Sequence, residues 1–241
     1  MAPRFFLLAG MTSALTAPAL AAGEEAKPPH KLSFEIEAVS DYRYRGVSLS
    51  GGEPALQAEA LLEFDSGFWA SVWGSTLSGT DVELQLGLGY SKDIFHQLNL
   101  EVSLNYYAYP SDGSSNYFEG AAALSYPVGS LTPKIGLEYA PRQGHLRDEQ
   151  GVKRNNLYAY LALDLEIAKT PITLNGQVGY ETGLFDTRDK GGKWDWRVGA
   201  TAETKWVDFG LAYVDSNGRL IDGRGRNLAG ETVVATLGKS F

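Results

Sequence analysis

The sequence lacks cysteine, an excess of positive charge and, beyond its N-terminus, any long apolar run. None of the 241 residues is cysteine, so neither a disulfide nor a thioether-linked lipid is expected. No later stretch approaches the roughly 20 apolar residues of a membrane-spanning helix, which excludes an α-helical membrane protein. Asp and Glu number 29 against 21 Lys and Arg, for a formal net charge of −8. Without a basic tract, nucleic acid is not an expected partner.

The N-terminal residues indicate export. Arg4 precedes a mostly apolar segment, and the small residues Ala19 and Ala21 stand where a signal peptidase requires them. We therefore expect a signal peptide at residues 1–21, whereas a membrane anchor is disfavoured because the segment is short and interrupted by polar residues. Residues 22–31 show no apolar periodicity and predict a flexible periplasmic leader. One domain, residues 32–241, follows.

From residue 32 the sequence alternates between apolar and polar residues. Between residues 82 and 90, for example, Val, Leu, Leu, Leu and Tyr alternate with Glu, Gln, Gly and Gly. A period of two is typical of a β-strand with one apolar and one polar face. The 28 glycines and the 13 Tyr, 10 Phe and 5 Trp residues also favour strands and turns. The pattern predicts twelve strands, at residues 32–46, 54–65, 67–77, 81–91, 97–109, 116–126, 131–141, 154–167, 172–183, 193–204, 207–214 and 231–241.

Alternation alone fits both a soluble sandwich or barrel and a membrane barrel whose apolar face is outward. Aromatic residues at both ends of the strands, including Tyr42 and Tyr44 at the end of the first, favour the membrane barrel because membrane interfaces select aromatic rings. The C-terminal Phe241 also matches, although Lys239 departs from the apolar pattern. Short links lie on the side of both termini. We therefore predict an all-β, transmembrane, antiparallel up-and-down barrel of about 12 strands with both termini periplasmic.

The opposite face of the strands is strongly polar and carries more carboxylates than bases. We interpret it as the lining of a water-filled, cation-favouring pore. Arg43, Arg45 and Arg197 are expected near the outer mouth as a cluster of opposite charge. Two alternatives stay open: mutual salt bridges seal the lumen, or the interior is plugged. The predicted pore-lining residues are Glu35, Glu37, Asp41, Arg43, Arg45, Glu59, Glu83, Glu101, Glu119, Glu138, Asp164, Glu181, Asp195 and Arg197.

The sequence offers little for catalysis or metal binding. An acyl hydrolase needs a serine beside a histidine, yet His30, His96 and His145 fall in the leader, a turn and a long loop. These histidines also lack the spacing of metal ligands. We expect no enzymatic activity, no metal and no cofactor.

Three segments carry a family resemblance. They are SDYRYRGVSLSGGEPALQ at 40–57, SGFWASVWGST at 66–76 and ELQLGLGYSKDI at 83–94. The chain resembles the TorF family of outer-membrane porins of Gram-negative bacteria. The resemblance implies an outer-membrane barrel with a channel role, and it brings no catalytic residues and no defined substrate. Arg43, Arg45 and Gly46 match the most specific part of the motif.

The leading hypothesis is an outer-membrane porin for passive diffusion of small hydrophilic solutes or ions. The alternative is a sealed structural or adhesive barrel whose extracellular loops bind a partner. Outer-membrane lipids and small solutes are the expected partners, and the sequence does not indicate an oligomeric state.

Overall fold

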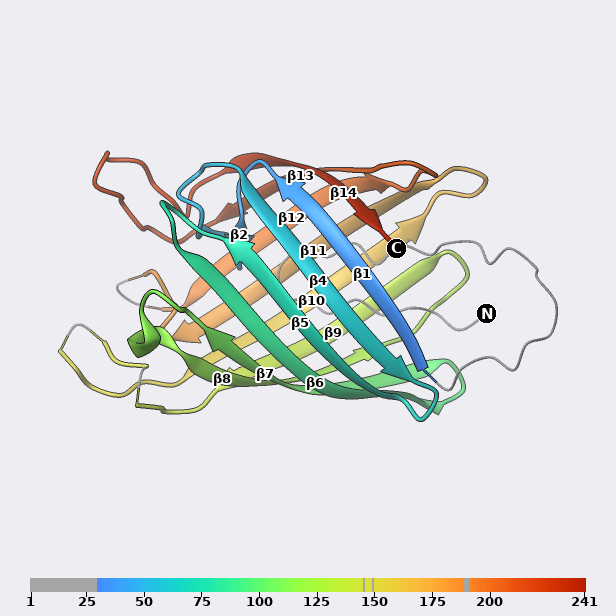
Figure 1. Cartoon of the computed structure of the whole chain (residues 1–241), viewed down its shortest axis with the longest axis horizontal. Coiled ribbons are helices and arrows are strands. Elements are labelled where there is room, and N and C mark those ends of the chain that lie inside the picture. The colour runs from blue at the N-terminus through green and yellow to red at the C-terminus, as the bar shows by residue number, and fades with distance from the viewer. Residues whose placement is uncertain (1–29, 145, 149, 189–190) are drawn as a thin grey trace.

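The computed structural model describes residues 30–144, 146–148, 150–188 and 191–241. Within these residues twelve long antiparallel strands form one closed barrel, and two short strands form a separate hairpin (Figure 1). The predicted signal peptide and most of the predicted leader lie outside the described residues, while His30 and Lys31 already belong to the first strand. The strands are β1 His30–Val39, β2 Arg43–Tyr44, β3 Val47–Ser48, β4 Ala55–Phe64, β5 Phe68–Thr76, β6 Val82–Phe95, β7 Leu98–Ala108, β8 Tyr117–Ser125, β9 Leu131–Ala140, β10 Asn156–Glu166, β11 Ile172–Gly183, β12 Lys193–Ala202, β13 Asp208–Ser216 and β14 Thr232–Ser240.

The barrel closes because β1 pairs with β4 on one side and with β14 on the other. Every other long strand pairs with its neighbours in the sequence, so the predicted up-and-down topology is confirmed. The backbone N–H of Phe34 donates to the carbonyl oxygen of Phe241 at 3.2 Å. The C-terminal residue therefore lies beside the middle of β1, in the half of the barrel that carries the short turns (Figure 1).

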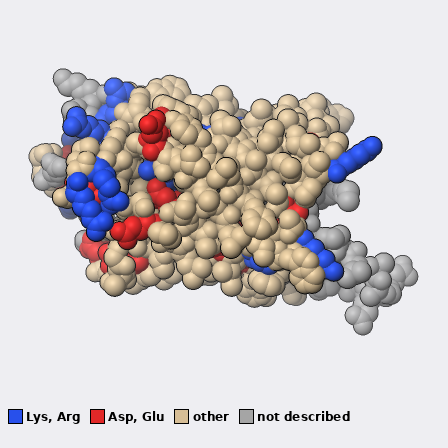
Figure 2. Space-filling model, turned by 90° about the horizontal axis from the view of Figure 1, so that it is seen from above, with Lys and Arg blue, Asp and Glu red and all other residues tan. Residues whose placement is uncertain are grey.

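The outside of the barrel is apolar and the inside is polar, as the alternation predicts. On β6, Leu86 and Leu88 are 49% and 63% exposed, whereas Glu83 and Gln85, on the other face of the same strand, are 1% and 2% exposed. Figure 2 shows the consequence as a broad uncharged band between two charged ends. No helix in the described part of the chain is long and apolar enough to cross a membrane.

Aromatic side chains fill much of the interior by packing on glycines of neighbouring strands. The ring of Tyr160 on β10 covers Gly136 on β9, and Tyr158 covers Gly179 on β11 so closely that a Cβ at either glycine would overlap the ring. The alternation places seven aromatic residues on the inward face. Six of them are buried and Tyr109 is partly buried; the six are Trp69, Trp73, Tyr107, Tyr117, Tyr158 and Tyr160.

The first strand is shorter than predicted, and this difference changes the interior. The predicted strand runs to residue 46, but β1 ends at Val39. The following residues turn inward and form the hairpin of β2 and β3. Tyr42 is 3% exposed, so its predicted place among the outward aromatics is wrong. We call residues 40–54 the inner hairpin.

Candidate functional site

The inner hairpin lies across the long-loop end of the barrel and is bonded to two other loops. The backbone N–H of Ser48 donates to the carbonyl oxygen of Leu228 at 2.8 Å, and that of Ser78 donates to Leu49 at 3.2 Å. A guanidinium N–H of Arg43 reaches the carbonyl oxygen of Gly230. The hairpin is therefore held to the loops that follow β13 and β5.

The inner hairpin is also stabilised from within by Asp41. Its carboxylate pairs with Arg43 at 2.7 Å and accepts hydrogen bonds from the hydroxyls of Ser48 and Ser50, at 2.5 and 3.1 Å. All four side chains are buried. A buried carboxylate with several donors is well satisfied, so Asp41 orders the hairpin and does not line an open pore.

The turn of the hairpin directs Arg45 into the interior. Arg45 and Gly46 both adopt positive φ angles, of 48° and 81°. At position 46 a Cβ would come within 2.9 Å of the Cβ atoms of Asp195 and Ser216. Only glycine combines this backbone conformation with so close an approach. Gly46 therefore lets the turn press against the barrel wall and carry the arginine inward.

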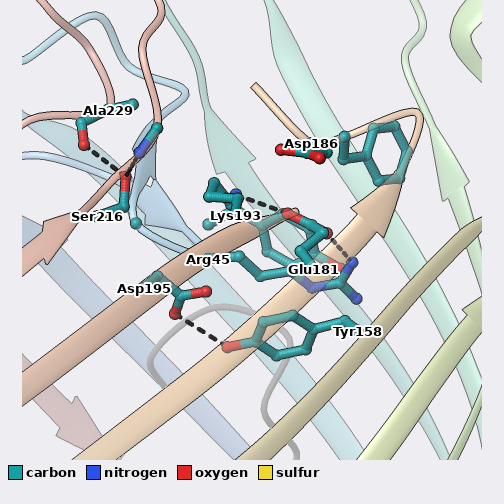
Figure 3. A network of polar contacts seen from close by, with 12 residues as sticks. Arg45, Tyr158, Glu181, Asp186, Lys193, Asp195, Ser216 and Ala229 are labelled. Carbon is teal, nitrogen blue, oxygen red and sulfur yellow. Dashed lines mark hydrogen bonds and ion pairs between the residues drawn. The ribbon is translucent and has the colours of Figure 1, made fainter. Parts of the chain in front are cut away.

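Arg45 binds three glutamates from three strands. Its Nη1 donates to Oε1 of Glu181 on β11 at 2.7 Å (Figure 3), and its Nη2 donates to Oε1 of Glu119 on β8 at 2.7 Å. Nη2 also donates to Glu138 on β9. The guanidinium lies between the rings of Tyr44 and Tyr158, 4.5 and 4.4 Å from their centroids. We call Arg45 and these three glutamates the arginine cluster.

A second cation joins the arginine cluster from β12. The Nζ atom of Lys193 lies 2.6 Å from Oε2 of Glu181 (Figure 3). The side-chain amide of Asn156 donates to Oε1 of the same carboxylate at 2.9 Å. Lys193 is only 1% exposed. Three glutamates therefore face two cations, so the cluster keeps a formal charge of −1.

Arg45 stays charged in this buried place. Burial disfavours the charged guanidinium, but the Coulombic attraction of Glu119 and the neighbouring acids raises the pKa of Arg45 well above its ordinary value. A buried ion pair is costly to break because the remaining charge would be left without a partner. The arginine cluster is thus a strong bond between the inner hairpin and the barrel wall.

The interior differs between its two ends. At the long-loop end, Glu83, Glu119, Glu181 and Asp195 are each at most 4% exposed, so water does not reach them. Towards the short turns, the inward positions Glu35, Glu59, Asp164 and Arg197 are only partly buried. The inner hairpin therefore covers the long-loop end, whereas the inward side chains at the short-turn end stay partly exposed. We call this short-turn end of the interior the vestibule.

The structure brings only some of the predicted pore-lining residues together. The arginine cluster contains Arg45, Glu119, Glu138 and Glu181, whereas the predicted cluster of three arginines does not form because Arg43 pairs with Asp41 within the hairpin. The other positions are spread along the inward face, where Tyr42 donates to Glu83 at 3.3 Å, Tyr158 donates to Asp195 at 3.0 Å and Lys134 lies 3.7 Å from Glu101. The remaining inward positions are Glu35, Glu37, Glu59, Asp164 and Arg197.

Two contributors to the site are absent from the predicted set. Lys193 sits at the start of a strand, beside a long loop, and strand parity with Asp195 was the signal that could have placed it inward. Tyr158 has the right parity but its contact with Arg45 depends on the hairpin. Gly46, Gly51 and Gly52 all adopt positive φ angles, and these glycines were a signal in the sequence that the chain turns there.

Two outer loops carry their own ion pairs. In the loop after β9, the side chain of Arg154 and the backbone N–H of Val152 lower the pKa of Asp148. In the loop after β13, hydrogen bonds from Arg226 lower the pKa of Asp222. These carboxylates order exposed outer loops. Among the described residues, no group of three or more His, Asp or Glu side chains is placed to hold a metal ion.

The sequence of residues 23–241 matches the profile of a family described as bacterial protein of unknown function (Gcw_chp). The chain belongs to the Gcw_chp family. A comparison with curated protein sequences gave no match. The Gcw_chp barrel is similar in fold to a structure named KdgM porin, with a TM-score of 0.59 and 9% identity over 87% of this chain and 98% of that one.

A second similar structure is the COG4313 outer membrane channel from Pseudomonas putida F1. Its TM-score is 0.52 and its identity 13%, over 92% of this chain and 99% of that one. At these identities the likeness concerns the fold. The Gcw_chp chain therefore has a barrel of the kind found in proteins described as porins and outer-membrane channels.

Proposed function

We propose that the protein is a Gram-negative outer-membrane channel for small hydrophilic solutes or ions, cation-favouring and closed at its outer mouth by the inner hairpin. Both termini face the periplasm in this proposal, and residues 1–21 direct export. The role is transport, not catalysis. The resemblance to the TorF porins at residues 40–57 supports it, and the inner hairpin occupies residues 40–54 of this segment.

The apolar exterior supports a membrane location. Leucines in the middle of the strands, such as Leu88, Leu104 and Leu211, are more than half exposed. Large exposed apolar surfaces are rare on soluble monomers, and an apolar band is what a transmembrane barrel presents to lipid.

The observation that carries the channel proposal is the way in which the interior is closed. One segment of 15 residues, inserted from one loop, covers the long-loop end of the interior. Its attachments are side-chain ion pairs and a few loop hydrogen bonds, and it adds no strand to the barrel. It could therefore move without opening the strand pairing. A lumen of this barrel size lies between filled eight-stranded and open 16-stranded barrels.

A sealed structural barrel is the second candidate. The arginine cluster favours it, because buried pairs that are well satisfied hold a segment in place. In that case the outer loops would be the functional surface and would bind a partner.

Planar-bilayer recording of refolded protein separates the two candidates. The channel proposal predicts discrete current steps, with a reversal potential under a KCl gradient that reports preference for K⁺. A mock preparation, purified and refolded in the same way from cells that lack this protein, is the matched control for contaminating porins. A membrane that stays silent across repeated insertions would contradict the channel and favour the sealed barrel.

A further inference from the structure

The long loops after β9, β11 and β13 carry an excess of positive charge, although the chain as a whole is acidic. These loops are residues 141–155, 184–192 and 217–231, and their sequences contain nine Lys and Arg against six Asp and Glu. The loops after β5 and β7, residues 77–81 and 109–116, contain no Lys or Arg. The positive charge therefore lies on one side of the long-loop end. We call the three loops that carry it the basic loops.

The basic loops are joined to one another. The backbone N–H of Leu184 donates to the carbonyl oxygen of Asn155 at 3.0 Å, and that of Arg219 donates to the carbonyl oxygen of Thr187 at 3.3 Å. Figure 2 shows Lys and Arg side chains gathered at the long-loop end of the barrel, on the left. The cations of three separate loops therefore act together on a partner that lies against this end.

The cations of the basic loops are exposed, whereas most of the carboxylates are used within the loops. Asp148, Asp186 and Asp222 each accept hydrogen bonds from backbone N–H groups of their own loops and are only partly exposed. The surface is therefore more positive than the count of charges indicates. Every Lys and Arg that the structure describes in the basic loops is exposed, namely Arg142, Arg147, Lys153, Arg154, Arg188, Arg219, Arg224 and Arg226.

Several of these cations have no counter-charge within the described part of the chain. Arg142, Lys153 and Arg219 make no ion pair with another described residue, whereas Arg154 and Arg226 pair with carboxylates of their own loops. Like charges held on one surface repel each other. An anionic partner would relieve this repulsion.

The basic loops begin at the level where the membrane interface is expected. Tyr139, Trp194 and Tyr213 are each more than two-fifths exposed on the outside of the strands that lead into these loops, and such aromatic rings are typical of a membrane–water interface. Arg142 follows Tyr139 by three residues, a separation of at most roughly 11 Å along the chain. The cations therefore stand at the height of lipid headgroups.

The loop after β13 also presents apolar side chains beside its cations. Leu220 and Ile221, which directly follow Arg219, are 41% and 46% exposed. Cations beside exposed apolar side chains suit an amphiphilic partner better than a small ion. A guanidinium group in turn binds phosphate through parallel N–H donors.

We infer that the basic loops bind the phosphate groups of anionic lipids in the outer leaflet of the membrane. The cations supply the charge, and their place directly above the aromatic residues supplies the height. This inference goes beyond the proposed channel and rests on its orientation, in which the long loops lie outside the cell.

Native mass spectrometry of the full chain in detergent micelles tests the inference. The probe is lipid A, a disaccharide lipid with two phosphate groups, and its monophosphoryl form is the matched ligand. The wild type should bind lipid A more strongly than the monophosphoryl form, and phosphatidylcholine most weakly. The triple variant Arg142→Gln/Lys153→Gln/Arg219→Gln should bind lipid A at least about ten-fold more weakly, because each cation near an anionic surface contributes roughly five-fold.

Removal of three cations at the other end is the matched control for the triple variant. Lys92, Lys169 and Lys205 are exposed near three separate turns at the vestibule end of the barrel. The variant Lys92→Gln/Lys169→Gln/Lys205→Gln loses the same charge and should bind lipid A as the wild type does. Heat-modifiable gel migration verifies that both variants are folded.

The inference has clear contrary results. Equal binding of lipid A and phosphatidylcholine by the wild type would contradict it, and so would equal affinities for lipid A in the two triple variants. Displacement of lipid A by inorganic phosphate at the same phosphate concentration would contradict it as well, because the site would then bind a free anion. Bilayer recording keeps the two proposals apart, since lipid A binding to a silent barrel removes only the channel, and current without lipid A binding removes only the lipid surface.

Discussion

Replacement of Arg45 by alanine should strongly destabilise the barrel. The change removes the guanidinium shared by Glu119, Glu138 and Glu181 and leaves Lys193 as the cation of the arginine cluster. Removing one partner of a buried ion pair costs about 3–5 kcal/mol, and we expect a loss of unfolding free energy in that range. Although Arg45 has three partners, the loss should stay near the cost of one broken pair, because water can enter the space that the side chain vacates.

Guanidinium-induced unfolding in lipid vesicles, followed by tryptophan fluorescence, measures this loss. Arg142→Ala is the matched control, because that arginine is exposed on an outer loop and its removal should change stability by less than about 0.5 kcal/mol. Adding Glu138→Gln to Arg45→Ala should restore part of the stability, since it removes one uncompensated charge. A loss below about 1 kcal/mol for Arg45→Ala would refute the reasoning that the cluster holds the hairpin.

Three further predictions concern the wall and the loops. Leu86→Arg should cost about 2–4 kcal/mol near the bilayer midplane, measured by the same unfolding assay, whereas Val152→Arg on an outer loop should be nearly neutral. Gly136→Ala should cost about 1–3 kcal/mol because the new methyl group overlaps an inward tyrosine ring, whereas Gly223→Ala meets open space. The pKa of Asp148 is lowered in the folded loop. Asp148 should therefore stabilise the loop fully at pH values above its ordinary pKa of 3.8, and this stabilisation should be lost as the pH falls through the lowered pKa. The rate of amide hydrogen exchange at neighbouring residues measures this loss.

Each of these has a clear contrary result. If Leu86→Arg and Val152→Arg lowered the free energy of unfolding equally, Leu86 would not face lipid. A neutral Gly136→Ala would mean that the tyrosine moves freely. If the loop amides lost their protection from hydrogen exchange already at neutral pH, Asp148 would not be what orders the loop.

The strands could be predicted because a period of two reports the two faces directly. Eleven of the predicted strands agree with the structure to within a few residues, and β11 has the same bounds as predicted. The side on which the apolar residues lie follows from the aromatic residues at the strand ends, and the exposed Phe34, Phe68 and Trp194 agree with it. Local pattern and global fold coincide over most of the chain.

The inner hairpin could not be predicted from the same pattern. Alternation continues through residues 40–46, so parity alone extends the first strand to residue 46 and places Tyr42 and Tyr44 outside. The chain instead leaves the wall after Val39, and Arg45 takes a positive φ angle that its residue type rarely adopts. The carboxylates that hold Arg45 come from strands 74 to 136 residues away, and pairing over such distances has no local signal.

The central claim is that the inner hairpin closes a channel, and a reversible tether tests it most directly. A Cβ at Gly51 would lie 3.5 Å from the Cβ of Ser78, which is within the range for a disulfide, and the native chain has no cysteine to interfere. The variant Gly51→Cys/Ser78→Cys should conduct in planar bilayers when reduced and lose most of its current when oxidised, while the wild type is unaffected by the oxidant. Equal currents in the oxidised and reduced states, with the disulfide verified by mass spectrometry, would contradict the claim.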